Sequence, residues 1–474
     1  MKPLRFTLLA MACLLAPVAY TQDLPSLGDA SSGIVSPEFE HALGRAWLSL
    51  LRGQVPQISD PLLKEYVERS VYKLAETSQV QDRRLEFILV ESPQLNAFAA
   101  PGGIIGVNGG LFLQAQTEAE YASVMAHELA HLSQRHFARG LEAQRRMQLP
   151  LMGALLAGVV AAAAGAGDAG IAAIASTQAA AIQAQRRFSR QNEEEADRVG
   201  MQNLARAGYN PRAMPQMFER LMRQYRFDQR PPEFLLTHPV TESRVADTRG
   251  RAEQLSDTGR ADSLDYQLMR ARTHLLFETT PGMSIKQFRA QLDKNPELAA
   301  ARYGLALAQM KAGQLQPARE QLDVLLKNPN PIYSLAEIEW LQYANRIPEA
   351  KEKVNALLAK SPRYYPAQQS LIDILIKQNN LTEAEHQLDI LAAQRSQDPD
   401  IWYQVAEIRG LTGNIIGLHR ARAEYFALVG DYSQALEQIS LAKRLAGNFQ
   451  MAARLDARYQ ELLKEQSMVK EMLN

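Results

Sequence analysis

The stretch TEAEYASVMAHELAHLSQRHFARG, residues 117–140, decides the fold of the first half of the chain. Thr117 and, three residues later, Glu120 form the pattern of a capping box, which predicts that a helix begins here. Apolar residues recur behind this start at the spacing of one helix face. His127 and His131 are one helical turn apart, so their imidazoles project from the same face and can bind one metal ion.

Glu128 and His136 differ in what they can contribute to such a site. Glu128 lies beside the paired histidines and can accept a proton from water as a general base. His136 does not complete the extended zincin pattern, which requires Gly and His where this chain has Gln134 and Phe137. We therefore expect the helix to continue to about Arg139, with His136 packed behind the ligands.

A second, acidic helix is predicted in RRFSRQNEEEADRVGMQNLARAGYNP, residues 186–211, which ends on a Gly-Tyr-Asn-Pro stop signal. Glu193 and Asp197 are one turn apart on this helix, so one carboxylate can bind the metal while the other supports a ligand imidazole. Glu194 and Glu195 are rotated away from Glu193 around the helix, and we expect them to face solvent.

Four segments together resemble the zinc metallopeptidase family that includes the CAAX prenyl proteases and HtpX. They are NAFAAPGGIIGVNGGLF (96–112), HELAH (127–131), FSRQNEEEADRVG (188–200) and LLTHPVTESRVAD (235–247), and they occur in the order and at the spacing of that family. The resemblance implies one zinc ion per chain. It also implies the residue roles: His127, His131 and Glu193 as ligands, Glu128 as general base, and Asp197 as the partner of a ligand imidazole.

His238 lies in the His-Pro segment, beyond both predicted zinc helices. It can simply pack near the site, or it can donate a hydrogen bond to the oxyanion of a tetrahedral intermediate. It can also act as a removable fourth ligand, in the position that catalytic zinc keeps open. We favour this last role, because a protease that meets unfolded clients without control by ATP benefits from a closed resting state.

Short strands are predicted in RLEFILV (84–90) and NAFAAPGGIIGVNGG (96–110), the second interrupted by Pro101-Gly102-Gly103. A strand edge beside the metal helix can hold a peptide extended by adding it to the sheet. A purely structural hairpin is the alternative, since glycine also suits turns. The first half is therefore expected to be an α+β zincin domain with a small sheet.

The second half of the chain carries a repeated pattern. A Gly or Asn precedes an Ala by five residues at Gly313/Ala318, Asn345/Ala350, Asn379/Ala384 and Gly430/Ala435. The first three starts are 32 and 34 residues apart, close to the length of a tetratricopeptide repeat. The pattern resembles a tetratricopeptide α-solenoid, which buries its core by stacking neighbours and presents a concave surface to partners. A generic helical array is the alternative.

We expect three parts in this mainly α-helical chain. Residues 1–21 have a charged start, a short apolar run and small residues, as in a cleaved export signal. Cleavage would remove Cys13, the only cysteine, which suits an oxidising compartment. Residues 22–258 are expected to form the metallopeptidase domain, and 262–474 the repeat domain. The Ala- and Gly-rich segment 149–181 is expected to be a helical lid over the active site that can touch a membrane surface; a paired or re-entrant insertion is the alternative.

Basic and acidic residues are equal in number, at 52 each, so the overall charge does not favour nucleic-acid binding. An export signal, a zincin domain and helical repeats together resemble bacterial envelope proteases. The resemblance implies a periplasmic factor that promotes assembly of outer-membrane β-barrel proteins and degrades misassembled ones. Its implied partners are unfolded or stalled barrel precursors and, through the repeats, the barrel-assembly machinery. A mainly non-enzymatic assembly chaperone or adaptor with a normally closed zinc site is the alternative, which the intact Glu128 disfavours.

Overall fold

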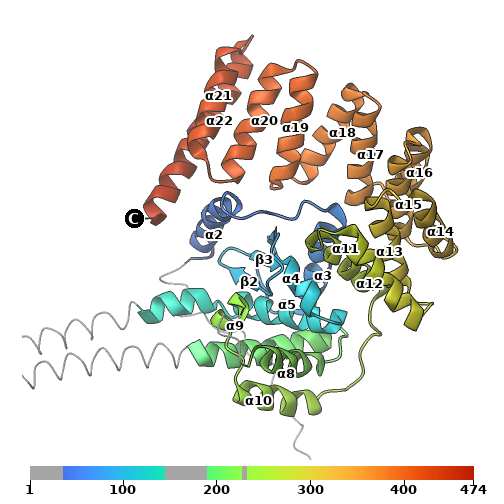
Figure 1. The fold of residues 1–474 in the computed structure, drawn as a ribbon. Coiled ribbons are helices and arrows are strands. Elements are labelled where there is room, and N and C mark those ends of the chain that lie inside the picture. Colours follow the sequence, from blue (N-terminus) through green and yellow to red (C-terminus); the bar gives the residue numbers. More distant parts are fainter. Residues whose placement is uncertain (1–35, 145–188, 227–231, 474) are drawn as a thin grey trace, which may run out of the picture.

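The computed structural model describes residues 36–144, 189–226 and 232–473 (Figure 1). The predicted export signal, residues 1–21, and the predicted lid, residues 149–181, lie outside these ranges. The described part is mainly helical and contains one small sheet, followed by an array of helix pairs. The predicted fold class, an α+β domain with a small sheet followed by an α-solenoid, is confirmed.

Two helices with side-chain caps begin the described chain. Ser36 precedes α2 (Pro37–Arg52), and its hydroxyl accepts a hydrogen bond from the N–H of Phe39. Asp60 caps α3 (Pro61–Thr77) in the same way. Both helices have proline in the first turn, where its missing N–H costs no hydrogen bond.

A three-stranded sheet follows, formed by β1 (Glu86–Val90), β2 (Ala97–Ala100) and β3 (Ile104–Asn108) in the order β1-β3-β2. β3 pairs parallel to β1 and antiparallel to β2, so the predicted hairpin is present and β2 lies at one edge. The hairpin turn uses positive φ angles at Gly102 and Gly103, which glycine adopts without strain. On β3, a Cβ at Gly106 would lie 1.9 Å from the ring of Phe98, so only glycine lets this ring lie over the strand.

The helix of the HELAH motif is α5 (Glu118–Ser133), and Thr117 caps it by accepting the N–H of Glu120, as predicted. Its predicted end at about Arg139 was wrong. α5 ends at Ser133, and a separate helix occupies residues 136–144. The break comes from Arg135, whose φ of 50° is left-handed and cannot continue an α-helix.

The other helices of the first half surround α5. The helix that carries the acidic motif spans residues 189–206. The remaining ones are α4 (Gly109–Gln114), α8 (Ala213–Tyr225), α9 (Glu233–Thr237) and α10 (Glu242–Glu253). The acidic helix, α8 and α10 lie on the side of α5 away from the repeats, whereas α4 contacts the first repeat helix (Figure 1).

Twelve helices form the repeat half. They are α11 (Leu264–Phe277), α12 (Pro281–Lys294), α13 (Ala299–Lys311), α14 (Leu315–Leu325), α15 (Pro331–Tyr343), α16 (Ile347–Lys360), α17 (Tyr365–Lys377), α18 (Leu381–Gln394), α19 (Pro399–Leu411), α20 (Ile415–Leu428), α21 (Tyr432–Arg444) and α22 (Phe449–Leu473). The repeated Gly or Asn residues lie in the turns between helices, all with positive φ. The alanine that follows each of them is fully buried between paired helices.

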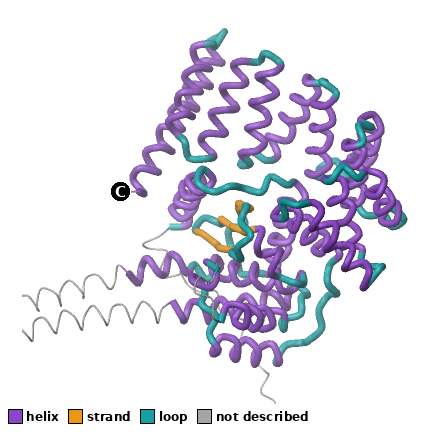
Figure 2. Tube along the Cα trace, viewed as in Figure 1, coloured by secondary structure: helices purple, strands orange, loops and turns teal. Residues whose placement is uncertain are grey.

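The repeat helices curve around α2, α3 and the sheet (Figures 1 and 2). Ion pairs hold the two halves together: Lys64 on α3 lies 3.0 Å from Asp398, just before α19, and Arg395 pairs with Glu68. Ala46 on α2 packs into the apolar cluster of the last helices. Among the described helices, none combines the length and the apolar character that a membrane span requires.

Candidate metal centre

Four side chains converge at the C-terminal half of α5. One ligand atom from each of His127, His131, Glu193 and His238 lies within 4.8 Å of the other three. The Nε2 atoms of the first two histidines are 3.0 Å apart, and His238 Nδ1 lies 3.0 Å from Glu193 Oε1. The structure thus brings together all four residues that the sequence nominated as ligands.

The four side chains come from three separate elements of the structure. His127 and His131 lie on one face of α5, and Glu193 comes from the helix of residues 189–206. A Cβ at Gly200 on that helix would lie 3.0 Å from the backbone of α5, so glycine lets the two helices approach closely. His238 follows α9, and its backbone N–H donates to Phe234 at 2.8 Å.

His127 has a carboxylate partner on the side away from the cluster. Its Nδ1 atom lies 3.0 Å from Asp197 Oδ1, so an Nδ1–H donor there leaves the Nε2 lone pair directed at the cluster. Arg244 donates to both oxygens of Asp197, at 2.7 and 2.8 Å. Burial opposes ionisation of Asp197, but these bonds outweigh it and hold its pKa below the ordinary value.

His131 has a different partner, His136, which the sequence placed behind the ligands without showing which ligand it contacts. Its Nδ1 atom lies 2.9 Å from His136 Nδ1, and His136 Nε2 lies 3.2 Å from Glu195 Oε2. Arg139 donates to the same carboxylate oxygen at 2.8 Å. Glu195 was expected to face solvent; instead it is half-buried and anchors this chain of contacts, whereas Glu194 is exposed as expected.

Glu128 is almost fully buried beside the cluster and at the edge of the sheet. Its Oε2 atom accepts the backbone N–H of Ala99 on β2 at 3.0 Å, and its Oε1 atom lies 3.7 Å from His238 Nε2. Within the described residues, Oε1 is buried and has no hydrogen-bond partner. Burial raises the pKa of Glu128 above that of a free carboxyl group.

The charges around the cluster fit a bound cation. Among the described residues, the three buried carboxylates of Glu128, Glu193 and Asp197 face one buried guanidinium, that of Arg244. With neutral imidazoles this leaves two negative charges uncompensated, which is costly in a buried place. Burial alone would lower the pKa of His127, but the carboxylates of Asp197 and Glu193 outweigh burial and raise this pKa to about 10. A divalent ion bound by the imidazole nitrogens and Glu193 would remove this imbalance.

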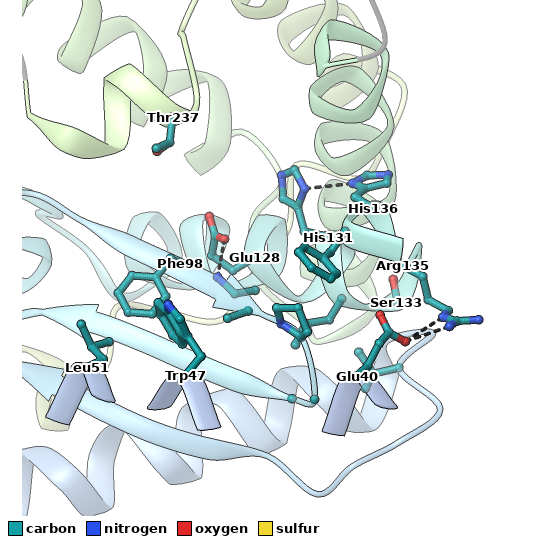
Figure 3. Close-up of a pocket in the computed structure, with 18 of the residues that line it drawn as sticks. Glu40, Trp47, Leu51, Phe98, Glu128, His131, Ser133, Arg135, His136 and Thr237 are labelled. Carbon is teal, nitrogen blue, oxygen red and sulfur yellow. Dashed lines mark hydrogen bonds and ion pairs between the residues drawn. The ribbon is translucent and has the colours of Figure 1, made fainter. Parts of the chain in front are cut away.

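A cavity of about 690 Å³ opens beside the cluster (Figure 3). Glu128, His131 and His238 line one side of it. β2 and α2 contribute Phe98 and Trp47 to the opposite side, and Figure 3 shows both rings below Glu128. The cavity therefore reaches the cluster of ligand side chains.

Comparison with known protein families matches both halves of the chain. Residues 61–252 match the model of peptidase family M48, and residues 341–408 match a tetratricopeptide repeat model. The first match contains all four converging residues. The second agrees with the helix pairs of the repeat half.

Named relatives match over nearly the full chain. A putative beta-barrel assembly-enhancing protease of Vibrio cholerae is 35% identical over 93% of this chain and 92% of its own length. The beta-barrel assembly-enhancing protease of Escherichia coli is 34% identical over 94% of this chain and 92% of its own length. The mitochondrial metalloendopeptidase OMA1 of Arabidopsis thaliana is 33% identical over 31% of this chain and 28% of its own length. The chain therefore belongs to the family of β-barrel assembly-enhancing proteases and is a metalloendopeptidase.

Proposed function

We propose that this protein is a periplasmic zinc endopeptidase that promotes assembly of outer-membrane β-barrel proteins and degrades those that misassemble. The observation that carries this proposal is the convergence of His127, His131 and Glu193 on one point beside the buried carboxylate of Glu128. The printed names of the relatives support the choice of client proteins.

Zinc is the ion that these donors suit best, because two imidazoles and one carboxylate form a common catalytic zinc set. His127, His131 and Glu193 would hold one ion per chain, and Asp197 would orient the first imidazole. A zinc ion held there supplies a Lewis acid that polarises the carbonyl group of the scissile bond.

Glu128 acts as the general base in this proposal. Its carboxylate accepts a proton from the attacking water and returns it to the nitrogen of the leaving amine. The hydrogen bond from Ala99 fixes Oε2 at the strand edge. The unpartnered Oε1 atom is the oxygen that accepts the proton, because no other group of the described chain occupies it.

His238 is proposed as a removable fourth ligand. Its Nδ1 atom lies 3.0 Å from Glu193 Oε1 and 3.4 Å from His127 Nε2, so the imidazole reaches into the donor cluster. An imidazole in that place fills the position that a catalytic zinc site keeps for water or substrate. The alternative role for His238 is to donate a hydrogen bond to the oxyanion of the tetrahedral intermediate.

β2 is proposed to bind the substrate by strand addition. It is the edge strand of the sheet, and in the described part of the chain it pairs with β3 on one side only. Ala99 directs its N–H away from β3 and toward Glu128. A peptide paired with this edge would therefore pass beside the base in extended form.

The remaining assignments concern location and partners. Residues 1–21 are proposed to direct export to the periplasm, and residues 149–181 to cover the active site and touch the membrane surface. We assign residues 22–258 to the peptidase domain and 262–474 to the repeat domain. The repeats are proposed to bind the barrel-assembly machinery, and stalled barrel precursors are the clients of the peptidase.

A comparison of wild type with Glu128→Gln tests the proposed reaction. Full-length protein is incubated with an unfolded outer-membrane β-barrel protein, and the disappearance of the substrate is followed on gels. Wild type should degrade it, and the variant should retain one zinc per chain but cleave at least about a hundredfold more slowly. Equal rates in both proteins would contradict the role of Glu128.

A further inference from the structure

α2 presents three consecutive residues to three different neighbours. Ala46 belongs to the apolar cluster of the last repeat helices, and Leu48 packs against the sheet. Trp47 lies between them, is 39% exposed, and lines the cavity beside the metal centre. This arrangement follows from the rotation of about 100° between successive helical residues. α2 lies outside the residues that match the M48 model.

The position of α2 on the sheet is fixed by close contacts. A Cβ at Gly44 would lie 2.0 Å from the carbonyl oxygen of Pro101, so the helix contacts the hairpin turn directly. Arg45 pairs with Glu86 on β1 at 2.6 Å. α2 is therefore a fixed wall of the cavity.

A second tie joins α2 to the end of α5. Glu40 accepts a hydrogen bond from Arg135 at 2.8 Å, at the residue where α5 breaks. The pair is visible at one end of the cavity in Figure 3, with Trp47 and Leu51 farther along the same helix. The wall formed by α2 thus runs alongside the metal centre.

The part of the cavity lining beyond Glu40, from Trp47 onward, is apolar. Trp47 and Leu51 from α2, Val55 from the following loop and Phe98 from β2 form it. The rings of Trp47 and Phe98 are 5.5 Å apart and nearly perpendicular. None of these four side chains carries a charge, although Glu128 and His131 line the same cavity.

The strand register determines which substrate side chains would reach this wall. The N–H of Asn108 donates to the carbonyl of Asn96, and Ala99 donates to Glu128, so odd-numbered residues of β2 direct their backbone groups to the open edge. Phe98 lies on the face covered by α2, with Leu48 and Ile104. In an added strand, the residue opposite Phe98 directs its side chain to this same face.

We propose that Trp47, Leu51, Val55 and Phe98 form a subsite for one large apolar side chain, aromatic or long aliphatic, of the cleaved peptide. The proposal rests on the proposed function, because it requires a peptide paired with β2. A polar side chain would lose its hydration there without a hydrogen bond in return. An aromatic ring would gain edge contacts with the two aromatic rings.

Unfolded barrel strands have the pattern that such a subsite selects. Transmembrane β-strands alternate apolar and polar residues, so an extended segment places its apolar side chains on a single face. Pairing with β2 would turn that face toward α2. The substrate class is therefore an extended segment with a large apolar residue opposite Phe98, which the alternating pattern of barrel strands supplies.

Peptide binding tests the subsite without catalysis. Glu128→Gln protein is titrated with two fluorophore-labelled peptides of alternating sequence. The peptides are identical except that one has Phe and the other has Gln at the apolar positions. Fluorescence anisotropy gives the Kd of each peptide. The Phe peptide should bind at least about tenfold more tightly. Adding Trp47→Ala should remove most of this difference, and adding Trp47→Leu should remove part of it. Adding Phe39→Ala, an exposed residue of the same helix outside the cavity, should leave it unchanged.

Two results would overturn the subsite. The first is equal binding of both peptides to Glu128→Gln protein. The second is an unchanged difference between the two Kd values after Trp47→Ala is added, in a protein whose circular dichroism and melting temperature match those of the parent. Cleavage by the Glu128-containing protein is measured separately. Cleavage of both peptides at equal rates would reject the subsite and leave the proposed function standing. Selective binding without cleavage would reject the proposed function and leave the subsite standing.

Discussion

His131 and His136 contact each other through their Nδ1 atoms, 2.9 Å apart. Donation from His136 Nε2 to Glu195 leaves His136 Nδ1 as an acceptor, so His131 Nδ1 must be the donor. This tautomer leaves the lone pair of His131 Nε2 free to face the cluster. His127 reaches the same state through the carboxylate of Asp197. The two ligand imidazoles are therefore oriented alike by chemically different partners.

Replacing His136 by Ala should weaken metal binding without unfolding the protein. Loss of the hydrogen bond frees the ring of His131, and such changes around a metal site cost about ten- to a hundredfold in metal affinity. Competition with a zinc chelator measures the effect, and His386→Ala, at an exposed histidine of the repeats, is the matched control. Unchanged zinc affinity in His136→Ala would show that its contact with His131 has no role in binding.

Removal of Glu193 should have a larger effect than removal of His136. Glu193→Ala leaves the two histidines of α5 as the only proposed permanent ligands, and two protein ligands are too few for a tight zinc site. Metal analysis after dialysis should find much less than one zinc per chain. Glu194→Ala, at the exposed neighbouring glutamate, should retain the ion. Full zinc occupancy in Glu193→Ala would contradict the assignment of Glu193.

The sequence alone predicts the site residues whose positions follow from helical spacing or from the order of the motifs. Helical spacing predicts that His127 and His131 lie on one face of a helix, and the order of the motifs predicts that Glu193 joins them. The contact between His131 and His136 was not predictable, because it needs the break at Arg135. Neither Gly nor Pro marks that break in the sequence. A tertiary contact, the pair between Arg135 and Glu40, accompanies it.

The repeat half was predictable for the opposite reason. Its Gly and Asn residues occupy turns that need positive φ, such as 71° at Gly313 and 54° at Asn345, and these residue types tolerate that conformation best. No comparable sequence pattern predicted that α2 lines the cavity beside the metal centre. Its apolar residues look alike in sequence, and only the structure shows that they face the repeats, the sheet and the cavity.

His238→Ala should raise basal proteolysis if His238 closes the site at rest. The variant keeps His127, His131 and Glu193, so zinc should stay bound while the fourth position becomes open. Turnover of an unfolded substrate and zinc content are measured in the same preparation. A protein that retains its zinc but cleaves much more slowly than wild type would reject the closing role and favour the oxyanion role.

Acid should weaken the junction between the two halves of the chain through Asp398. Burial by itself raises the pKa of this carboxyl group, but the charges of Lys64 and Arg395 outweigh it and hold the pKa below its ordinary value. Because the folded-state pKa is depressed, ionised Asp398 stabilises the fold above the unfolded value of about 3.9, and this contribution is lost as pH falls further. Asp398→Asn should therefore destabilise the fold by about 2 kcal/mol near neutral pH, because Lys64 loses a charge-assisted hydrogen bond, although Lys64 keeps Asp400 and Arg395 keeps Glu68 as partners.

Thermal unfolding of wild type and Asp398→Asn across a range of pH measures this difference. The two melting temperatures should lie well apart at pH 7 and begin to converge below about pH 3.9, because the unfolded wild-type chain then binds a proton at this carboxyl group more readily than the folded protein does. Asp389→Asn is the matched control, because Asp389 pairs with Arg409 in an exposed position, with 49% of its side chain accessible. Such exposed pairs contribute about 1 kcal/mol or less. A constant gap between wild type and Asp398→Asn from pH 7 down to pH 3 would show that the carboxyl group, and not its charge, holds the junction.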